Sequence, residues 1–392
     1  MTELVEISAQ ELGRRLRLAR EIARVKQERA ADAIGTSRPT LVSIEQGVRK
    51  VKIQEIQKLA QLYGMSVNAL LRREAVHTNL IPRFRRLRES EDAHTLEAIG
   101  VLNDLIKADI EIENVLGIQR KWKYPPELSI DQGDVVELAE RHAEDLRKWL
   151  GLGPGPIADI FSVIELGLGI RLYQRYLSPS SKIAGLFTYD DDVGACIFLN
   201  ASHPLPRRIQ SAAHELGHFI GTRRNPEVLE ENERFLSREE RYANAFGRAF
   251  VAPAGSFTES FRRLKEITGK VTRRLIILLA QEYNISRQAC VFRLEDLGLT
   301  KKGTWAWFQG NGGITEDHVR DVLGDAGPRP NPAKADAQRP VSHRLSLMAH
   351  AAWKRDLMSE GQLADLLRIG RLELREIIDQ IELEECELDG KL

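Results

Sequence analysis

The feature that most constrains this chain is the five-residue run His214-Glu215-Leu216-Gly217-His218. On a helix, residues i and i+4 lie on one face, so both imidazoles can hold one metal ion. Glu215 then lies to one side, where its carboxylate can take a proton from the water that attacks a peptide bond. The preceding residues, 207–213, are good helix formers. The pattern predicts a helix with two zinc ligands and a general base.

A catalytic zinc site keeps three protein ligands and one open position, so a third ligand is needed. The helix predicted to begin near Arg238 supplies Glu240, and Asn244 lies one turn later, where it could orient an imidazole. Glu239 is the alternative ligand, since it lies only about 100° around the same helix. The competing interpretations are structural. They are a buried helix with hydrogen-bonded histidines, and an acidic first turn that the helix dipole favours.

The segments around the motif predict a mainly α fold with a small β-sheet, of the α+β class. Strands are expected at 170–177, 183–189 and 193–199, and the acidic turn Asp190-Asp-Asp favours a hairpin between the last two. The strand ending at Asn200 could form one wall of a cleft and pair with an extended substrate. Helices are expected at 78–118, 134–150, 156–166, 207–221, 238–251, 271–282 and 286–297.

The first 75 residues have a different pattern, with five short helical segments separated by turn residues. Gly35 ends the second segment, and Ser37 and Pro39 begin the third as N-cap and first-turn residues. Residues 1–90 carry 18 Lys and Arg against 10 Asp and Glu, whereas the whole chain has 57 of each. This basic excess favours a nucleic-acid partner, because phosphate contacts supply most non-specific affinity.

The His-Glu motif is followed by Glu240-x-x-Ala243-Asn244-x-Phe246 and by Phe250-Val-Ala-Pro253. Together these residues resemble the ImmA/IrrE family of intracellular zinc metallopeptidases, over about residues 133–300. The resemblance implies a Zn²⁺ cofactor with His214, His218 and Glu240 as its ligands, and Glu215 as the general base.

The chain departs from the family pattern in three places: Tyr242 stands where an acid is common, Gly247 where alanine is common, and Val251-Ala252 replace a bulkier apolar pair. None of these is a proposed ligand, so the departures concern packing and substrate fit. The transition-state oxyanion needs a donor besides zinc. Tyr242, His203 and Tyr189 are candidates for it, each with a structural role as the alternative.

Residues Gln10 to Arg73 resemble the Cro/repressor-like (XRE) helix-turn-helix, in which the third helix enters the major groove. The resemblance implies double-stranded DNA as a partner. We expect Glu45 to form an internal salt bridge with Arg14 or Arg15. The alternative is a protein-interaction module that does not bind DNA. The residues expected to contact DNA are Gln27, Ser37, Arg38, Thr40 and Ser43.

These segments predict five regions: a helix-turn-helix domain (8–75), a helical connector (76–132), the peptidase domain (133–300), a Pro/Gly/Ala-rich linker (301–340) and a C-terminal helical region (341–392). No apolar run approaches the roughly 18 residues that span a bilayer, and the start lacks a secretory signal. We therefore expect a cytoplasmic protein with no membrane contact.

The combined prediction is a DNA-binding transcriptional regulator with a zinc-dependent endopeptidase domain. By resemblance, its substrate is an intracellular repressor, whose cleavage switches on a stress or mobile-element response. We expect a homodimer, since such domains often read paired half-sites. One alternative is a transcription factor that uses the peptidase-like domain as a metal or ligand sensor, and another is an antitoxin.

Overall fold

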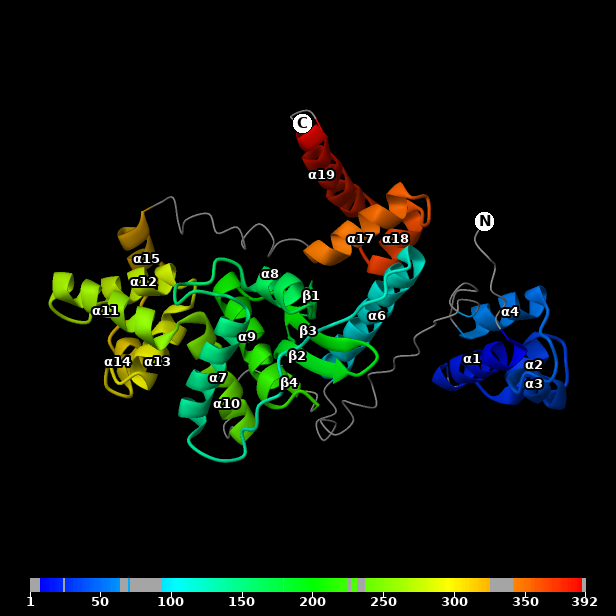
Figure 1. Cartoon of the computed structure of the whole chain (residues 1–392), viewed down its shortest axis with the longest axis horizontal. Coiled ribbons are helices and arrows are strands. Elements are labelled where there is room, and N and C mark those ends of the chain that lie inside the picture. Colours follow the sequence, from blue (N-terminus) through cyan, green and yellow to red (C-terminus); the bar gives the residue numbers. More distant parts are fainter. Residues whose placement is uncertain are drawn as a thin grey trace. The chain divides into compact units, whose positions relative to one another are not determined.

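The computed structural model describes residues 8–23, 25–63, 70, 93–178, 180–224, 227–230, 237–324 and 341–389. Most of these residues are helical, and the strands form one small sheet (Figure 1). The expected mainly α, α+β fold class is therefore confirmed. The chain divides into two compact units, Met1–Asn79 with Asp109–Ile118, and Leu80–Ala108 with Gln119–Leu392.

The first unit contains four of the five predicted short helices. The fifth, at 67–71, lies outside the described residues except for Leu70. Each described helix buries an apolar face, and Leu16, Ile34, Leu41 and Ile56 meet in one core. The helices are α1 (Ala9–Ile22), α2 (Gln27–Ala33), α3 (Arg38–Glu45) and α4 (Ile53–Tyr63).

The turn between α2 and α3 follows the sequence prediction in its backbone. Gly35 has a φ of +68°, and the amide of Thr36 donates to the carbonyl of Ala31 at 2.9 Å. Ser37 is the N-cap residue of α3, with proline in the first turn. Its side chain does not cap the helix, however, because Ser37 Oγ is hydrogen-bonded to Thr40 Oγ1 at 2.9 Å.

The salt bridge of Glu45 differs from the prediction. Its partner is Arg20, with Nε 2.6 Å from Oε1 and Nη2 3.1 Å from Oε2. The expected partners Arg14 and Arg15 were wrong, since Arg15 extends elsewhere and donates to the carbonyl of Leu70. The pair is buried, with the Glu45 side chain 3% exposed and that of Arg20 10% exposed. It fixes the end of α3 against α1.

The second unit is built around a four-stranded sheet in the order β1-β3-β2-β4. The strands are β1 (Arg171–Arg175), β2 (Ile183–Asp190), β3 (Gly194–Asn200) and β4 (Glu227–Glu230). The β2–β3 hairpin turns at the predicted acidic residues, whereas β4 was not predicted. The prediction that β3 pairs with a substrate was wrong, because β1 and β2 already pair with its two edges.

Two helices carry the motif residues, α9 (Leu205–Gly221) and α10 (Arg238–Val251), and both lie close to their predicted ranges. Helix α9 packs on β2 and β3, and α10 packs on α9 and on α7 (Val135–Trp149). The two motif helices approach closely at Gly217, where an added Cβ would lie 2.7 Å from the Cα of Ala243. Small residues at this crossing therefore set the separation of the predicted ligands.

The other helices between Ala93 and Leu323 complete this part of the chain, and the end of one of them, from Asp109 on, belongs to the first unit. The segment expected to begin at Pro156 becomes helical only at Ile160, where Asp159 caps the first turn. The predicted linker contains α14 and α15, and residues 325–340 lie outside the described residues. The helices are α6 (Ala93–Leu116), α8 (Ile160–Ser162), η2 (Val163–Gly167), α11 (Ala254–Thr268), α12 (Arg273–Glu282), α13 (Arg287–Asp296), α14 (Thr304–Gly310) and α15 (Glu316–Leu323).

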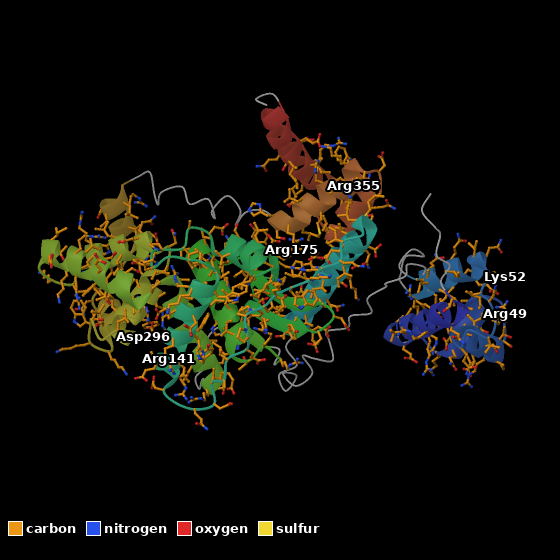
Figure 2. The ribbon with its side chains drawn as sticks, viewed as in Figure 1. Arg49, Lys52, Arg141, Arg175, Asp296 and Arg355 are labelled. Atoms are coloured by element: carbon orange, nitrogen blue, oxygen red, sulfur yellow. The ribbon has the colours of Figure 1, made fainter. Side chains whose placement is uncertain are left out.

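The C-terminal helices are α17 (His343–Lys354), α18 (Glu360–Leu367) and α19 (Arg371–Asp389). Arg175 at the end of β1, labelled in Figure 2, donates to the carbonyl of Leu367 at 3.2 Å, and Arg368 pairs with Asp104 of α6 at 2.5 Å. Burial lowers the pKa of Arg175 to about 10. These contacts attach the three helices to the sheet and to α6.

The C-terminal end of α18 has the same backbone hydrogen-bond pattern as that of α2. The amide of Ile369 donates to the carbonyl of Ala364 at 3.1 Å, as Thr36 does to Ala31. Arg368, with a φ of +54°, takes the place of the glycine after α2. Residues 341–389 carry six Lys and Arg against eleven Asp and Glu. These residues are therefore acidic overall, in contrast to the basic excess of residues 1–90.

In the described part of the chain, no helix combines the length and apolarity needed to cross a membrane.

Candidate metal centre

The structure brings together the side chains of His214, His218 and Glu240. The two Nε2 atoms are 3.0 Å apart, and they lie 3.4 Å and 3.2 Å from the two carboxylate oxygens of Glu240. Helix α9 provides both imidazoles from adjacent turns, and the first turn of α10 provides the carboxylate. Within the described residues, these three side chains are the cluster whose donor atoms lie close enough together to hold one metal ion. Glu239, the alternative third ligand, is not part of it.

Each imidazole is oriented by a neighbour at its other nitrogen. His214 Nδ1 lies 3.3 Å from Asn244 Oδ1, and His218 Nδ1 lies 3.1 Å from Thr222 Oγ1. Such contacts fix the tautomer and leave Nε2 directed at the metal position. The role of Asn244 was predicted from the sequence, whereas that of Thr222 was not. Its position four residues after His218 was the signal that could have identified it.

Burial sets the charge of this group. It lowers the pKa of both His214 and His218 to about 3, so both rings are neutral near pH 7. Burial also raises the pKa of Glu240, although nearby His214 partly opposes this effect. Neutral imidazoles and a carboxylate that lacks bulk water are the donors a zinc ion requires. The donor set therefore fits Zn²⁺ as predicted.

Glu215 is fully buried between α9 and the sheet. It lies against Gly185 of β2, where an added Cβ would be 2.4 Å from Glu215 Oε1. The register between β2 and β4 shifts between Ile183 and Gly185, which gives the strand an irregularity beside the carboxylate. Gly185 was not identified from the sequence, because no local pattern links a strand glycine to a helix glutamate.

None of the three predicted oxyanion donors lines the cavity beside the metal ligands. The Tyr242 hydroxyl is hydrogen-bonded to His142 Nδ1 at 2.8 Å, and burial raises its pKa. Tyr189 donates to Asp191 Oδ1 at 3.0 Å in the β2–β3 turn, and His203 follows β3. The contacts of the two tyrosines support the structural alternative for both.

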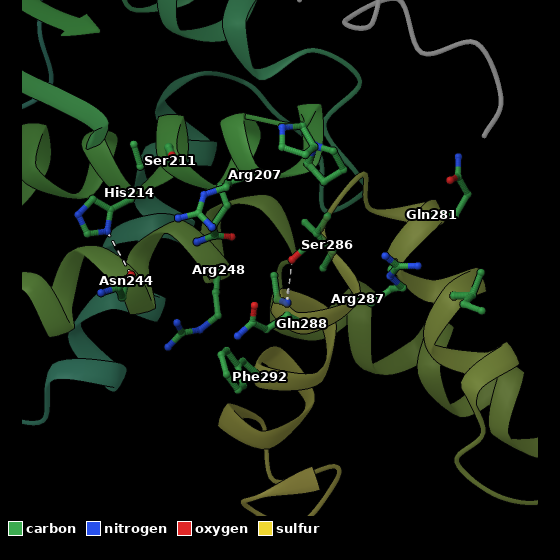
Figure 3. Close-up of a pocket in the computed structure, with 18 of the residues that line it drawn as sticks. Arg207, Ser211, His214, Asn244, Arg248, Gln281, Ser286, Arg287, Gln288 and Phe292 are labelled. Carbon is green, nitrogen blue, oxygen red and sulfur yellow. Dashed lines mark hydrogen bonds between the residues drawn. The ribbon is translucent and has the colours of Figure 1, made fainter. Parts of the chain in front are cut away.

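A cavity of about 830 Å³ opens beside the centre and is lined by His214 and Glu240. Figure 3 shows His214 hydrogen-bonded to Asn244, with arginine, glutamine and serine side chains around the same pocket. Apolar side chains of α12, α13 and α15 complete the wall. They are Ile277, Ala280, Ala289, Phe292, Val319 and Leu323. The cavity is large enough for a peptide segment of a few residues.

In the first unit, the predicted DNA-contacting residues lie at the start of α3 and the start of α2. Ser37 and Arg38 are exposed, and Thr40 is half-buried. Gln27 is held in a network, since it donates to Glu45 at 3.1 Å and accepts from Arg38 Nε at 3.3 Å. The half-buried Ser43 donates to the carbonyl of Pro39 at 3.1 Å.

The loop between α3 and α4 adds basic residues that were not predicted to contact DNA. Arg49 and Lys52, labelled in Figure 2, lie in this loop. The Arg49 guanidinium contacts both carboxylate oxygens of Glu55, at 3.1 and 2.8 Å, and the amide of Lys52 donates to the same carboxylate.

Comparison with known proteins assigns both domains. The model of the IrrE N-terminal-like domain matches residues 168–295, and that of a helix-turn-helix domain matches residues 11–73. The chain joins a helix-turn-helix domain to an IrrE N-terminal-like domain. The predicted XRE and ImmA/IrrE resemblance is thereby confirmed. The IrrE-like match contains both histidines, Glu215 and Glu240, so the candidate metal centre lies in the metallopeptidase-like domain.

No curated protein matches the chain. Among solved structures, ComR from Streptococcus suis aligns over 99% of this chain and 98% of that chain, at 13% identity and a TM-score of 0.16. This similarity is too low to inform the function.

Proposed function

We propose that this chain is a DNA-binding transcriptional regulator whose IrrE-like domain is a zinc-dependent endopeptidase. The observation that carries the proposal is the convergence of His214, His218 and Glu240 beside a cavity, with Glu215 buried on the same helix. A structural zinc site is closed, whereas a catalytic one keeps an open position. The open cavity at His214 and Glu240 supports the catalytic form.

The roles of the residues follow from their positions. A bound zinc ion would lower the pKa of a water to about 7 and polarise the peptide carbonyl. Glu215 would accept the proton of the attacking water on its carboxylate and pass it to the leaving amide nitrogen. Gly185 leaves the space in which this carboxylate is held, and Asn244 and Thr222 keep the imidazoles oriented.

The helix-turn-helix domain would direct the protein to double-stranded DNA. In this proposal, α3 enters the major groove, with Arg38 at a guanine edge and Ser37, Thr40 and Ser43 beside it. Gln27 supports Arg38 through the hydrogen bond between their side chains. The resemblance to repressors favours a homodimer on paired half-sites. By the same resemblance, the substrate is a repressor that controls a stress or mobile-element response.

The deciding experiment compares cells that produce the wild type, Glu215→Gln or Glu239→Gln from the same promoter. Zinc content of each purified protein is measured by mass spectrometry, and cellular proteins are compared by quantitative proteomics. We expect one zinc ion in all three proteins. We also expect a DNA-binding protein to accumulate only with Glu215→Gln. Glu239→Gln is the matched control, because it removes a neighbouring acid outside the donor group.

Two outcomes would contradict the proposal in different ways. Absence of zinc from the wild-type protein would reject the metal centre. Full zinc occupancy with identical proteomes would reject the peptidase and favour the sensor, in which the same centre reports a metal or ligand to the DNA-binding domain.

A further inference from the structure

The cavity beside the metal centre extends between α9 and α10 toward arginine side chains. On α9, the residues that line the cavity include His214, Ser211 one turn before it and Arg207 two turns before it. The metal-facing side of α10 leads forward from Glu240 to Arg248. The intervals are seven and eight residues, or about 11 Å at 1.5 Å per residue. Each motif helix thus carries one cavity-lining arginine about two turns along the backbone from its metal ligand.

A third arginine lines the same cavity. Arg287, at the start of α13, donates to Glu316 Oε1 at 2.5 Å and lies beside Gln288 (Figure 3). Two carboxylates line the cavity, Glu240 of the metal centre and Glu316, whose side chain is 75% exposed. The side chains that line the cavity thus include three arginines and two glutamates, one of which is the proposed metal ligand Glu240.

Arg248 is positioned to bind an anion. Its Nε donates to Asp296 Oδ2 at 2.6 Å, and Asp296, labelled in Figure 2, does not line the cavity. Within the described part of the chain, its two Nη groups make no hydrogen bond or ion pair shorter than 3.5 Å, so they remain available to a ligand. A guanidinium held through Nε presents its Nη groups in the geometry that binds a carboxylate.

We propose that this cavity is a substrate subsite for a carboxylate, and that Arg248 with Arg207 is its main determinant. The inference rests on the proposed peptidase function and names the substrate class of the same centre. A chain rises about 3.3–3.6 Å per residue when extended, so 11 Å corresponds to about three residues. The preferred substrate carries an acidic side chain, or a free chain terminus, two to three residues from the scissile bond.

The test uses synthetic peptide hydroxamates, whose hydroxamate binds zinc and fixes the register of the peptide. One series carries Glu, Gln or Lys at one, two or three residues from the hydroxamate, with amidated ends. A second series carries Gln there and ends in a carboxylate. Dissociation constants are measured by calorimetry on the full-length, zinc-loaded Glu215→Gln protein, so no turnover is needed.

We expect the Glu compound at two or three residues to bind about tenfold more tightly than the Gln compound, and the Lys compound more weakly than either. Arg248→Gln and Arg207→Gln should each reduce this preference. Arg241→Gln, an exposed arginine of the same helix that does not line the cavity, should leave it unchanged. If the carboxylate-ended peptides bind more tightly than the amidated Gln peptides, but the Glu peptides do not, the subsite binds a chain terminus.

Equal binding of Glu and Gln compounds would overturn the inference while leaving the metal centre intact. Failure of every hydroxamate to bind would instead contradict the proposed function. Thermal unfolding of each arginine variant, followed by circular dichroism, separates a lost subsite from a lost fold. A Glu preference retained in both Arg248→Gln and Arg207→Gln would also overturn the assignment.

Discussion

Gly185 of β2 and Glu215 of α9 are in contact, and a methyl group on the glycine would lie 2.4 Å from the glutamate Oε1. The same Cβ would approach the Cδ and Cγ of Glu215 at 3.3 and 3.4 Å. Because Glu215 is fully buried, its carboxylate has little room to move aside without disturbing its neighbours. The strand glycine therefore determines where the proposed general base lies.

Gly185→Ala should slow cleavage strongly while zinc binding is retained. The added methyl displaces the Glu215 carboxylate but does not touch the three donor side chains, so we expect a loss of about 10²-fold or more in kcat, as for a lost general base. Zinc content and cleavage of the accumulated substrate protein measure the two effects. Gly255→Ala, where nothing lies within 4 Å of the new Cβ, is the control. Wild-type cleavage by Gly185→Ala would contradict this role.

Glu240→Ala should weaken zinc binding far more than Glu239→Ala does. Both residues lie in the first turn of α10, but only Glu240 lies within 3.4 Å of the histidine Nε2 atoms. We expect Glu240→Ala to weaken zinc affinity on the order of 100-fold or more. This is at least as large as the loss caused by removing a residue that only hydrogen-bonds to a metal ligand. Competition with a chromogenic chelator gives both constants. Equal losses of zinc affinity in the two variants would mean that either glutamate of α10 can act as the third ligand.

Thr222→Val and Asn244→Ala should each lower zinc affinity by roughly 10- to 100-fold. Each substitution removes an oxygen that contacts the Nδ1 atom of one imidazole, at 3.1 Å for Thr222 and 3.3 Å for Asn244. Valine has nearly the shape of threonine, so the first variant removes the hydrogen bond with little change in packing. Unchanged zinc affinity in Thr222→Val would show that α9 packing alone orients His218.

The sequence predicted the parts of the centre that depend on helical periodicity. His214 and His218 are one turn apart on a single helix, and Glu240 with Asn244 repeats that spacing on the next. Side chains separated by four residues on a helix share a face, so their relation is local. The backbone of the α2–α3 turn was predictable for the same reason, since Gly35 and Pro39 act over a few residues.

Relations between distant segments were not predictable in this way. Glu45 pairs with Arg20 rather than Arg14 or Arg15, because the choice depends on how α3 packs on α1. The Gly185 contact depends on strand register, and the pairing of both edges of β3 depends on sheet order. Strand β4 has four residues, too few for a clear alternating pattern.

The zinc-free protein should lose stability as the pH falls from neutrality. Burial lowers the pKa of His214 and His218 from the ordinary 6.5 to about 3, so folding favours the neutral rings. The contribution of these neutral rings to the free energy of unfolding is fully present above about pH 6.5 and is lost progressively toward pH 3. Urea midpoints at pH 7.5, 6 and 5 in EDTA should therefore fall. The double variant His214→Gln/His218→Gln should show a flatter dependence, and an equally steep one would attribute the loss to other groups.

Arg38→Ala should weaken binding of the full chain to its preferred DNA sequence, with little change in salt dependence if Arg38 contacts a guanine as proposed. Arg38 is exposed at the first position of α3, and its Nε is held by Gln27. Loss of one cationic contact should lower the slope of log K against log salt by about 1 if Arg38 meets phosphate. If it reads a base, affinity should fall for one sequence with little change in slope. Fluorescence anisotropy with random duplexes, and then with a selected one, distinguishes the two. Lys58→Ala, on the exposed side of α4, is the control. Unchanged binding by Arg38→Ala on both duplexes would reject this docking of α3.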